Sequence, residues 1–320
     1  WACSTADSLS TSIFSPMKPA LRFFLIVIAL GASLVALDRG FGAVMERLTA
    51  TAKGGDTANH HYINLEAADS VLVMGSSRAN HHYDSSILEE RFGMPVYNCG
   101  TDGNGILLAA MQLNNILGRG VRPRVVIYDY YAKFDVFDSN DHIKPLARMR
   151  PYCELPGMAD IIDDLDPSEN LKLRSGMYRY NSSFLQIISD NVRPRQSVVK
   201  GYKPLTGEMD AAFGGSGPTP EGAVDSLKVR YLRRFIELCR RNDIRPVFVF
   251  SPHFLADENP HLGPLRREAG DSTLILDYSG DGRYCGRRDL FEDPSHLNAK
   301  GAALFSRELA DTLAVLGVVR

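Results

Sequence analysis

The chain has 320 residues, of which 44% are hydrophobic and 23% are charged, a composition typical of a globular protein with a sizeable core. Its formal net charge of -2, without an arginine-rich patch, excludes a general affinity for nucleic acid. The five cysteines form no C-x-x-C pair and no Cys/His cluster, so we expect no zinc site and no disulfide scaffold. No other cofactor motif is present, and we expect no cofactor.

An uncharged apolar run lies near the amino terminus. Phe23 to Leu37 follows Lys18 and Arg22, and it is slightly short for a membrane span of about 20 apolar residues unless flanking residues join it. No good A-x-A cleavage site follows. We therefore predict an uncleaved signal anchor at 17–40 over a cleaved signal peptide, with a buried core helix as a third interpretation. The basic flank predicts an inside amino terminus and an extracytoplasmic body, periplasmic or at the cell surface.

The segments that flank this anchor carry weaker signals. Residues 1–16 are interpreted as an unstructured extension or a mis-called start, because Met17-Lys18 reads as a natural beginning. Residues 41–64 are polar and contain glycine, which predicts a stem with a helical part near Phe41 to Leu48. We expect the folded α/β domain to occupy residues 65–320.

Within that domain, short apolar runs alternate with helical patterns. The expected strands are 70–74, 95–98, 124–130, 245–251 and 273–277, and the expected helices are 84–92, 105–117, 225–241 and 298–316. Apolar strands separated by helices predict a parallel sheet covered on both faces, and hence a three-layer α/β/α sandwich. The pattern breaks down at 134–224, which we interpret as one insertion that caps or walls a site.

Two loops at the expected carboxyl edge of the sheet, where open α/β sheets bind ligands, carry candidate chemistry. Gly75-Ser76-Ser77 follows the first strand, and Asp293 precedes His296 by three residues. This spacing lets the carboxylate accept a hydrogen bond from one imidazole nitrogen, so that the other nitrogen faces a nucleophile. The alternatives are that the serines form an ordinary turn, that Asp293 is a turn or cap residue, and that His296 is a surface histidine.

These motifs resemble those of the SGNH/GDSL hydrolases of the membrane-anchored bacterial envelope type. Gly75-Ser76-Ser77 stands where that family has Gly-Asp-Ser, and DPSHLNAKG (293–301) is similar to its closing Asp-x-x-His block. Between them, NCGTDGNG (98–105) is similar to the second block, which keeps an oxyanion-hole glycine. The blocks occur in family order between Ser70 and about Leu313.

The resemblance implies a flavodoxin-like SGNH hydrolase fold and a role for each residue of a catalytic triad. Ser77 would be the nucleophile, with Ser76, at the family's Asp position, as the alternative. His296 would be the general base and then the general acid, and Asp293 would orient it.

The resemblance also implies an oxyanion hole, although one of its parts is missing. The backbone N–H groups of Ser77 and Gly103 would bind the oxyanion, and Asn104 could supply a side-chain amide; one such donor is worth ~10²–10³ in rate. The family's third block, Gly-x-Asn-Asp, is absent, because the third strand runs into YDYYAKFD (128–135). Such divergence also occurs in relatives that handle acyl groups on envelope polysaccharides.

Other polar residues near these motifs have supporting or alternative roles. Arg78 would bind either an anionic substrate or a nearby carboxylate. Asp129 is interpreted as a hydrogen-bonded support, and His253 is the reserve candidate for the base. The adjacent His81 and His82 suggest a metal site, but neighbouring residues on one element point in different directions and no carboxylate cluster accompanies them. We therefore predict no metal.

The predicted function is that of a membrane-anchored serine esterase or acyl hydrolase of SGNH type. Its expected partners are an acyl-ester small molecule or polysaccharide, with an O-acetyl ester of an envelope carbohydrate as the candidate substrate, and the membrane through the amino-terminal helix. Two alternatives remain open. One is an O-acyltransferase with the same triad, and the other is a non-catalytic envelope protein that binds glycan or assists assembly.

Overall fold

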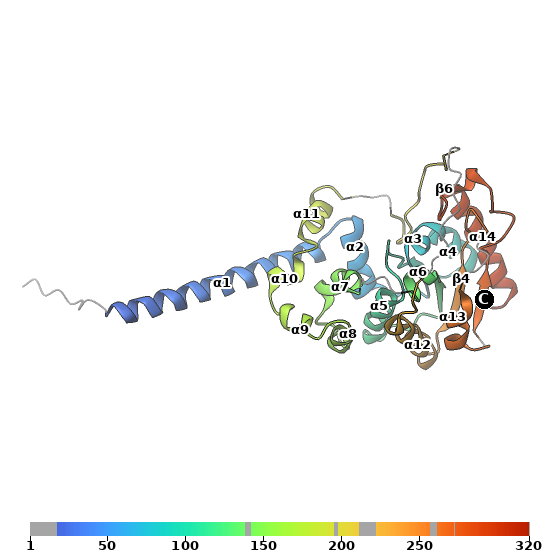
Figure 1. Cartoon of the computed structure of the whole chain (residues 1–320). Coiled ribbons are helices and arrows are strands. Elements are labelled where there is room, and N and C mark those ends of the chain that lie inside the picture. The colour runs from blue at the N-terminus through green and yellow to red at the C-terminus, as the bar shows by residue number, and fades with distance from the viewer. Residues whose placement is uncertain are drawn as a thin grey trace, which may run out of the picture.

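The computed structural model describes residues 18–137, 142–194, 198–210, 222–256, 261–271 and 273–319. A long amino-terminal helix projects from an α/β body (Figure 1). The predicted extension at 1–16 lies outside the described residues.

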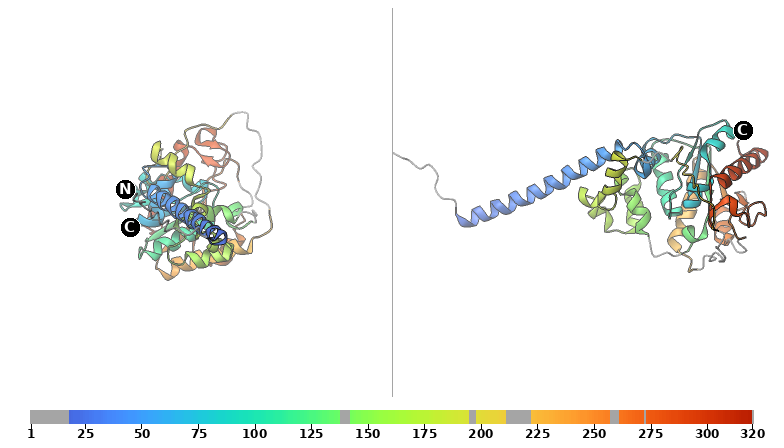
Figure 2. Two further views of the ribbon diagram at one scale, coloured as in Figure 1. Left: turned by 90° about the vertical axis from the view of Figure 1, so that its left-hand side faces the viewer. Right: turned by 90° about the horizontal axis from the view of Figure 1, so that it is seen from above.

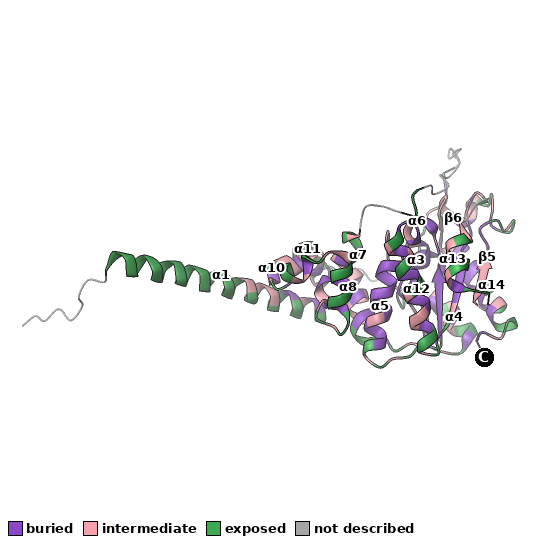
Figure 3. Cartoon of the chain, turned by 60° about the horizontal axis from the view of Figure 1, so that its bottom comes forward, coloured by how far each residue is buried: buried purple, intermediate pink, exposed green. Residues whose placement is uncertain are grey.

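The projecting helix is α1, Pro19–Ala50, which continues without interruption through the predicted anchor and into the predicted stem. Among the described residues, α1 is the helix that is long and apolar enough to cross a membrane, with a mean hydropathy of 2.4 over its apolar window. None of that window is buried within the protein (Figure 3), which rules out the core-helix interpretation. The apolar helix is thus confirmed, and its length and composition suit a membrane anchor or a signal sequence.

The body is built on a five-stranded parallel sheet, which confirms the sheet predicted from the apolar runs. Its strands are β1 (Val71–Gly75), β2 (Val96–Asn98), β3 (Val125–Asp129), β4 (Arg245–Phe250) and β5 (Leu274–Asp277). They pair in the order β2-β1-β3-β4-β5, which is the order of flavodoxin-like doubly wound sheets. The order reverses between β1 and β3, so a crevice for ligands is expected where β1 ends.

Successive strand residues face two separate hydrophobic cores, as the pleat of a strand requires. Leu72, Tyr128 and Phe248 belong to the core under α5 (Ile106–Gly118), α12 (Ser226–Arg241) and α13 (Leu262–Ala269). Val73 and Ile127 belong to the core under α4 (Ser85–Phe92) and α14 (Ala299–Val315). The sheet therefore has helices on both faces. Burial on both sides explains why the strands read as continuous apolar runs.

The predicted insertion forms short helices in two groups. They are α6 (Ala132–Asp135), α7 (Ile143–Met149), the 3-10 turn η2 (Arg150–Tyr152), α8 (Met158–Leu165), α9 (Glu169–Lys172), α10 (Gly176–Tyr180) and α11 (Phe184–Val192). The helices α10 and α11 pack on α1, whereas α6, α7 and α8 pack on α5 of the body. Figure 2 shows α8 to α11 at the end of the body from which α1 leaves. This helical part of the insertion therefore does not form the expected cap over the candidate site.

The predicted stem is part of the folded body. Met45 is buried with Tyr180 and Ile187 in a small core to which Phe41 and Leu48 also contribute. The chain then forms α2 (Gly55–His61) and the π-helix η1 (Tyr62–Glu66). The spacing of residues 41, 45 and 48 is the i, i+4, i+7 pattern of a helix that buries one face, a signal that the polar composition of the segment conceals.

Candidate active site

The candidate nucleophile follows a turn that only glycine permits. At Gly75 the backbone φ is +138°, and a Cβ atom there would lie 2.7 Å from the carbonyl oxygen of Asp129. Ser76 is extended and 1% exposed, and α3 (Ser77–His82) begins at the next residue. Ser77 is partly exposed. The turn therefore buries the hydroxyl of Ser76 and presents that of Ser77.

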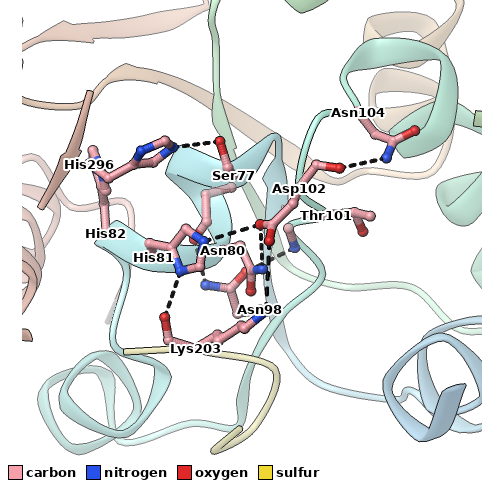
Figure 4. A network of polar contacts seen from close by, with 12 residues as sticks. Ser77, Asn80, His81, His82, Asn98, Thr101, Asp102, Asn104, Lys203 and His296 are labelled. Carbon is pink, nitrogen blue, oxygen red and sulfur yellow. Dashed lines mark hydrogen bonds and ion pairs between the residues drawn. The ribbon is translucent and has the colours of Figure 1, made fainter. Parts of the chain in front are cut away.

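Ser77, His296 and Asp293 form one chain of hydrogen bonds. The Ser77 hydroxyl lies 2.7 Å from Nε2 of His296, although 219 positions separate the two residues (Figure 4). His296 Nδ1 lies 2.8 Å from Oδ2 of Asp293. Because a carboxylate only accepts, Nδ1 carries the proton and Nε2 accepts the hydrogen bond that Ser77 donates. The structure thus brings together the three side chains that the sequence singled out.

Asp293 has two roles in holding this geometry. It ends β6 (Phe291–Asp293), which pairs with β7 (His296–Leu297), and its Oδ1 accepts hydrogen bonds from the backbone N–H groups of Ser295 and His296. It is therefore a turn residue and also the partner of the imidazole. Partial burial raises the pKa of its carboxyl. The His296 ring and the two N–H groups outweigh burial and hold the pKa below its ordinary value.

A second, buried histidine links α3 to the strand that carries His296. His82 is fully buried at the end of α3, and its Nε2 accepts from the backbone N–H of Leu297, the residue after His296. Its Nδ1 lies 2.9 Å from the hydroxyl oxygen of Ser251 in the loop after β4. Burial lowers the pKa of His82 well below its usual value, and the positive charge of Arg78 adds to this effect. His82 is therefore a neutral, two-sided hydrogen-bonding group that fixes the backbone next to His296.

Arg78 lies in a buried ion pair. Its guanidinium Nε is 3.6 Å from Oδ1 of Asp129, donates to Ser251 at 3.1 Å, and lies over the ring of Tyr131. Tyr83 donates to the other oxygen of Asp129 at 2.6 Å. Burial raises the pKa of Asp129, and the charge of Arg78 counters part of that rise. Asp129 is thus the nearby carboxylate that pairs with Arg78.

The loop at 98–104 lies on the other side of Ser77, and its side chains bind α3 and one another. Asn98 donates to the carbonyl oxygens of Ala79 and Tyr83. Asp102 accepts from Asn80 at 2.7 Å, and Asn104 donates to the Asp102 backbone carbonyl at 2.9 Å. Figure 4 shows the amide of Asn104 bonded to Asp102, which lies between it and Ser77. The structure therefore gives Asn104 a local partner and does not bring its amide to the hydroxyl.

Gly103 has a φ of +67°, the left-handed conformation that favours glycine. A Cβ atom at Gly103 would meet the ammonium group of Lys144 on α7. The conformation of the turn at 98–104 therefore favours glycine at this position.

His81 belongs to a polar cluster on the 98–104 side. Its Nδ1 donates to the backbone oxygen of Lys203 at 2.7 Å, and its Nε2 lies 3.2 Å from Asp102. Partial burial raises the pKa of Asp102, but hydrogen bonds from His81 and Asn80 outweigh it, so the pKa lies well below its ordinary value. Lys203 belongs to a strap, residues 198–210. The strap bonds to α3 through Asn80 and to the start of α14 through Leu205 and Ala299.

The remaining candidates lie outside the hydrogen-bonded chain of Ser77. His253, the reserve base, has Nδ1 3.0 Å from the carbonyl oxygen of Leu255 and Nε2 3.4 Å from the Ser295 hydroxyl. Among the described residues, no group of three His, Cys, Asp or Glu side chains is placed to share a metal ion.

Sequence reasoning missed α3 and the supporting role of His82. A helix of six residues offers too little periodicity to be seen, and a buried partner such as Ser251, 169 positions away, leaves no local signal. The adjacent His81 and His82 were the available signal in the sequence. They suggested a metal site and not a residue that holds the backbone beside His296.

Comparison with known proteins adds no family to these observations. No protein-family model matches the chain, and no curated protein matches it. The functional argument therefore depends on the fold and on the geometry of the site.

Proposed function

We propose that the chain is a membrane-anchored serine esterase of SGNH type that cleaves an acyl ester, with an O-acetyl ester of an envelope carbohydrate as the substrate class to test first. The observation that carries the proposal is the unbroken chain of hydrogen bonds from Ser77 through His296 to Asp293. It lies at the carboxyl end of β1, beside the point where the strand order reverses. Such a line of hydroxyl, imidazole and carboxylate is the arrangement that activates a serine for acyl transfer.

In the proposed reaction, the Ser77 oxygen attacks the ester carbonyl and its proton passes to Nε2 of His296. Asp293 stabilises the imidazolium that forms, and the imidazolium then gives its proton to the leaving alcohol. Water attacks the acyl-serine in the second half, and His296 accepts the proton of that water. The exposed fractions of the Asp293 and His296 side chains, 48% and 23%, fit a site open to a large substrate such as a polysaccharide.

The oxyanion would be held by backbone donors. Ser77 is the first residue of α3, where N–H groups have no partner within the helix. We assign this N–H group and that of Gly103 to the oxyanion, as the resemblance to the SGNH family implies. Asn104 donates to Asp102, so a third donor from this side chain would require its amide to turn.

The anchor gives the enzyme its proposed location. If α1 remains uncleaved, its apolar half spans the membrane and the body faces the periplasm or the cell surface. This location, together with the resemblance to SGNH proteins that handle acyl groups on envelope polysaccharides, is why envelope carbohydrates are the proposed substrate class.

A fluorophosphonate probe tests the proposed nucleophile in the full-length chain in detergent. We expect covalent labelling of the unaltered protein, complete loss of the label in Ser77→Ala, and retention in the matched control Ser76→Ala. Ser76 is buried and lies outside the hydrogen-bonded chain, so its loss leaves the triad intact. Absence of label on a folded, unaltered protein would favour the non-catalytic glycan-binding alternative.

A panel of acetylated glycans then tests the reaction. We expect acetate release that depends on Ser77. Equal release by the unaltered protein and Ser77→Ala would refute the assignment. Acetyl ester appearing on an added acceptor glycan, at the expense of released acetate, would identify the O-acyltransferase alternative.

A further inference from the structure

The body is joined tightly to α1 at the point where its apolar run ends. Asp38 is the first acidic residue after that run, and its carboxylate accepts hydrogen bonds from the N–H groups of Gly176 and Met177, each at 2.9 Å, at the start of α10. The Ser175 hydroxyl donates to the same carboxylate at 2.6 Å. A Cβ atom on Gly176 would lie 2.8 Å from Cα of Gly42, so the two backbones are in direct contact. This crossing fixes the start of α10 at the level of residues 38–42 of α1.

The length of the apolar run and its amino-terminal flank sets where that level lies relative to a bilayer. At a rise of 1.5 Å per residue, the helix from Pro19 to Leu37 is about 28 Å long, close to the ~30 Å thickness of a hydrocarbon core, and Arg22 lies within one turn of its amino-terminal end. A helix that spans the membrane with this segment therefore places Asp38 at the membrane-water interface. The start of α10 is held at the same depth, because it is bonded to Asp38.

Exposed apolar side chains lie on α10 and on the two helices that flank it in the chain, α9 and α11. Met177 on α10 is 50% exposed, Leu171 on α9 is 69% exposed, and Leu185 on α11 is 69% exposed. Phe184 precedes Leu185 on α11 and packs edge-on against Phe41. Phe41 is about one helical turn after Asp38 on α1. Figure 1 shows α9, α10 and α11 around α1 where it leaves the body. Single exposed leucines need no explanation, but a group around one membrane-spanning helix does.

Basic residues accompany the apolar ones. Arg39 follows Asp38 on α1, and Arg174 immediately precedes the Ser175 that bonds to Asp38; both are exposed. Long basic side chains beside an apolar surface suit the headgroup region, where the stem stays in the apolar layer and the charge reaches phosphate.

We propose that Leu171, Arg174, Met177 and Leu185 form a collar that rests in the headgroup layer of the bilayer. The apolar side chains enter the boundary of the hydrocarbon, and Arg174 and Arg39 contact lipid phosphates. The collar holds the body in one orientation on the membrane. α3 and β6 are well separated from α10 along the body (Figure 1), so the candidate site is held away from the bilayer. This inference depends on α1 being retained as an anchor and is independent of the esterase assignment.

Depth-dependent quenching in full-length protein tests the collar. Cys3, Cys153 and Cys285 are replaced by serine, which leaves the two buried cysteines. The environment-sensitive fluorophore NBD is then attached to Met177→Cys, to Ile28→Cys within the apolar run, or to Leu304→Cys on α14. Each protein is reconstituted in vesicles of phosphatidylethanolamine and phosphatidylglycerol, with or without nitroxide-labelled lipid. Ile28 is the positive control, and Leu304, 41% exposed on the body, is the matched negative control.

We expect nitroxide in the headgroup region to lower the fluorescence at residue 177 by roughly twofold or more, and to leave residue 304 unchanged. Nitroxide placed deep in the acyl chains should quench residue 28, at the centre of the span. That quenching without headgroup quenching at 177 would overturn the collar while the anchor stands. No quenching at residue 28 by the acyl-chain nitroxide would overturn both. Neither outcome affects fluorophosphonate labelling of Ser77, so failure of the collar is distinguishable from failure of the proposed esterase.

Discussion

The two sides of the candidate site use their polar groups differently. On the triad side, Ser77, His296 and Asp293 meet through side-chain hydrogen bonds, and His82 fixes the adjoining backbone. On the other side, the polar side chains of the 98–104 loop bind α3, the strap and the loop itself. The first side is arranged to move a proton, whereas the second holds a backbone turn in place.

Under the proposed assignment, this difference agrees with the absence of a Gly-x-Asn-Asp block. A proposed triad with only backbone donors for the oxyanion would still support acyl transfer, because each kind of group contributes separately to the rate. The absence of a side-chain donor would then lower the rate of simple ester hydrolysis more than it lowers covalent capture by an activated probe. We therefore expect a strong response to fluorophosphonate and slow turnover of small esters.

Replacing Asp293 by Asn should have the largest effect. The amide keeps the size of the carboxylate but favours the wrong imidazole tautomer, and it cannot stabilise the imidazolium. We expect the rate of ester cleavage to fall about 10³–10⁴-fold with little change in KM. Steady-state kinetics on an acetylated glycan measures this.

Since Asp293 also accepts from the N–H groups of Ser295 and His296, its amide variant needs a structural control. The Asn side-chain oxygen can still accept from these groups, so we expect the thermal midpoint to stay within a few degrees. An activity above a tenth of the unaltered level, with the fold intact, would show that His296 does not depend on this carboxylate.

His82→Phe should have the second largest effect. The ring volume is kept, but the buried Leu297 N–H loses its partner, which costs about 1–3 kcal/mol of stability, and Ser251 keeps its bonds from Arg78. Displacement of the backbone next to His296 should lower the labelling rate by about tenfold to a hundredfold. Labelling at a temperature where the variant is folded, with its thermal midpoint measured beside it, gives both numbers.

The matched control is Phe235→Leu, which weakens the core on the opposite face of the sheet. We expect a lowered thermal midpoint there and an unchanged labelling rate. If the two variants lost stability equally and kept equal labelling rates, His82 would be a structural residue with no influence on His296.

The sequence could predict the elements whose signals are local. The apolar strands and the helix caps are of this kind. Asp84, Asp225 and Asn298 each accept from N–H groups at a helix start, and each is the first residue of a helix expected from the sequence. The pair Asp293 and His296 was visible because the two residues lie in one turn.

The remaining features of the site depend on packing between distant segments. Arg78 and Ser251 meet only because β1, β3 and β4 are neighbours in the sheet, and that order is not readable from any one strand. The strap reaches α3 and α14 after a stretch of irregular sequence that carries no periodic pattern. The polar composition of the 41–64 segment likewise concealed an apolar face that becomes apparent only once α10 and α11 supply its partner.

Asp102→Asn tests the 98–104 side and should have a smaller effect, which depends on pH. Because the folded-state pKa lies below its unfolded value of about 4, the ionised carboxylate stabilises the fold above that pH. This contribution is lost as the pH falls through the folded value. We expect the variant to have a lower thermal midpoint than the unaltered protein at pH 7, and the gap to shrink below about pH 4. Calorimetry at both pH values measures it.

The gap should be modest because the carboxylate is nearly half exposed and solvent screens its charge. The reaction rate should fall about tenfold or less, since Asp102 supports a loop and touches no triad residue. A gap that widened toward acid pH would mean that Asp102 is not the charged partner of His81 and Lys203.

Asn104→Ala should have the smallest effect, and it separates the two sides most directly. If the amide donated to the oxyanion, its removal would cost ~10²–10³ in rate, as for other side-chain donors. In the structure the amide donates to the Asp102 carbonyl, and its own oxygen is buried without a hydrogen-bond partner. Replacing the side chain therefore removes one stabilising hydrogen bond and one destabilising unpaired oxygen, and the two effects on stability oppose each other. We expect the rate of ester cleavage to change by less than about threefold, well short of a lost oxyanion donor. A hundredfold loss in a folded variant would show that the loop reorganises around substrate and that the absent third block is replaced from within the second.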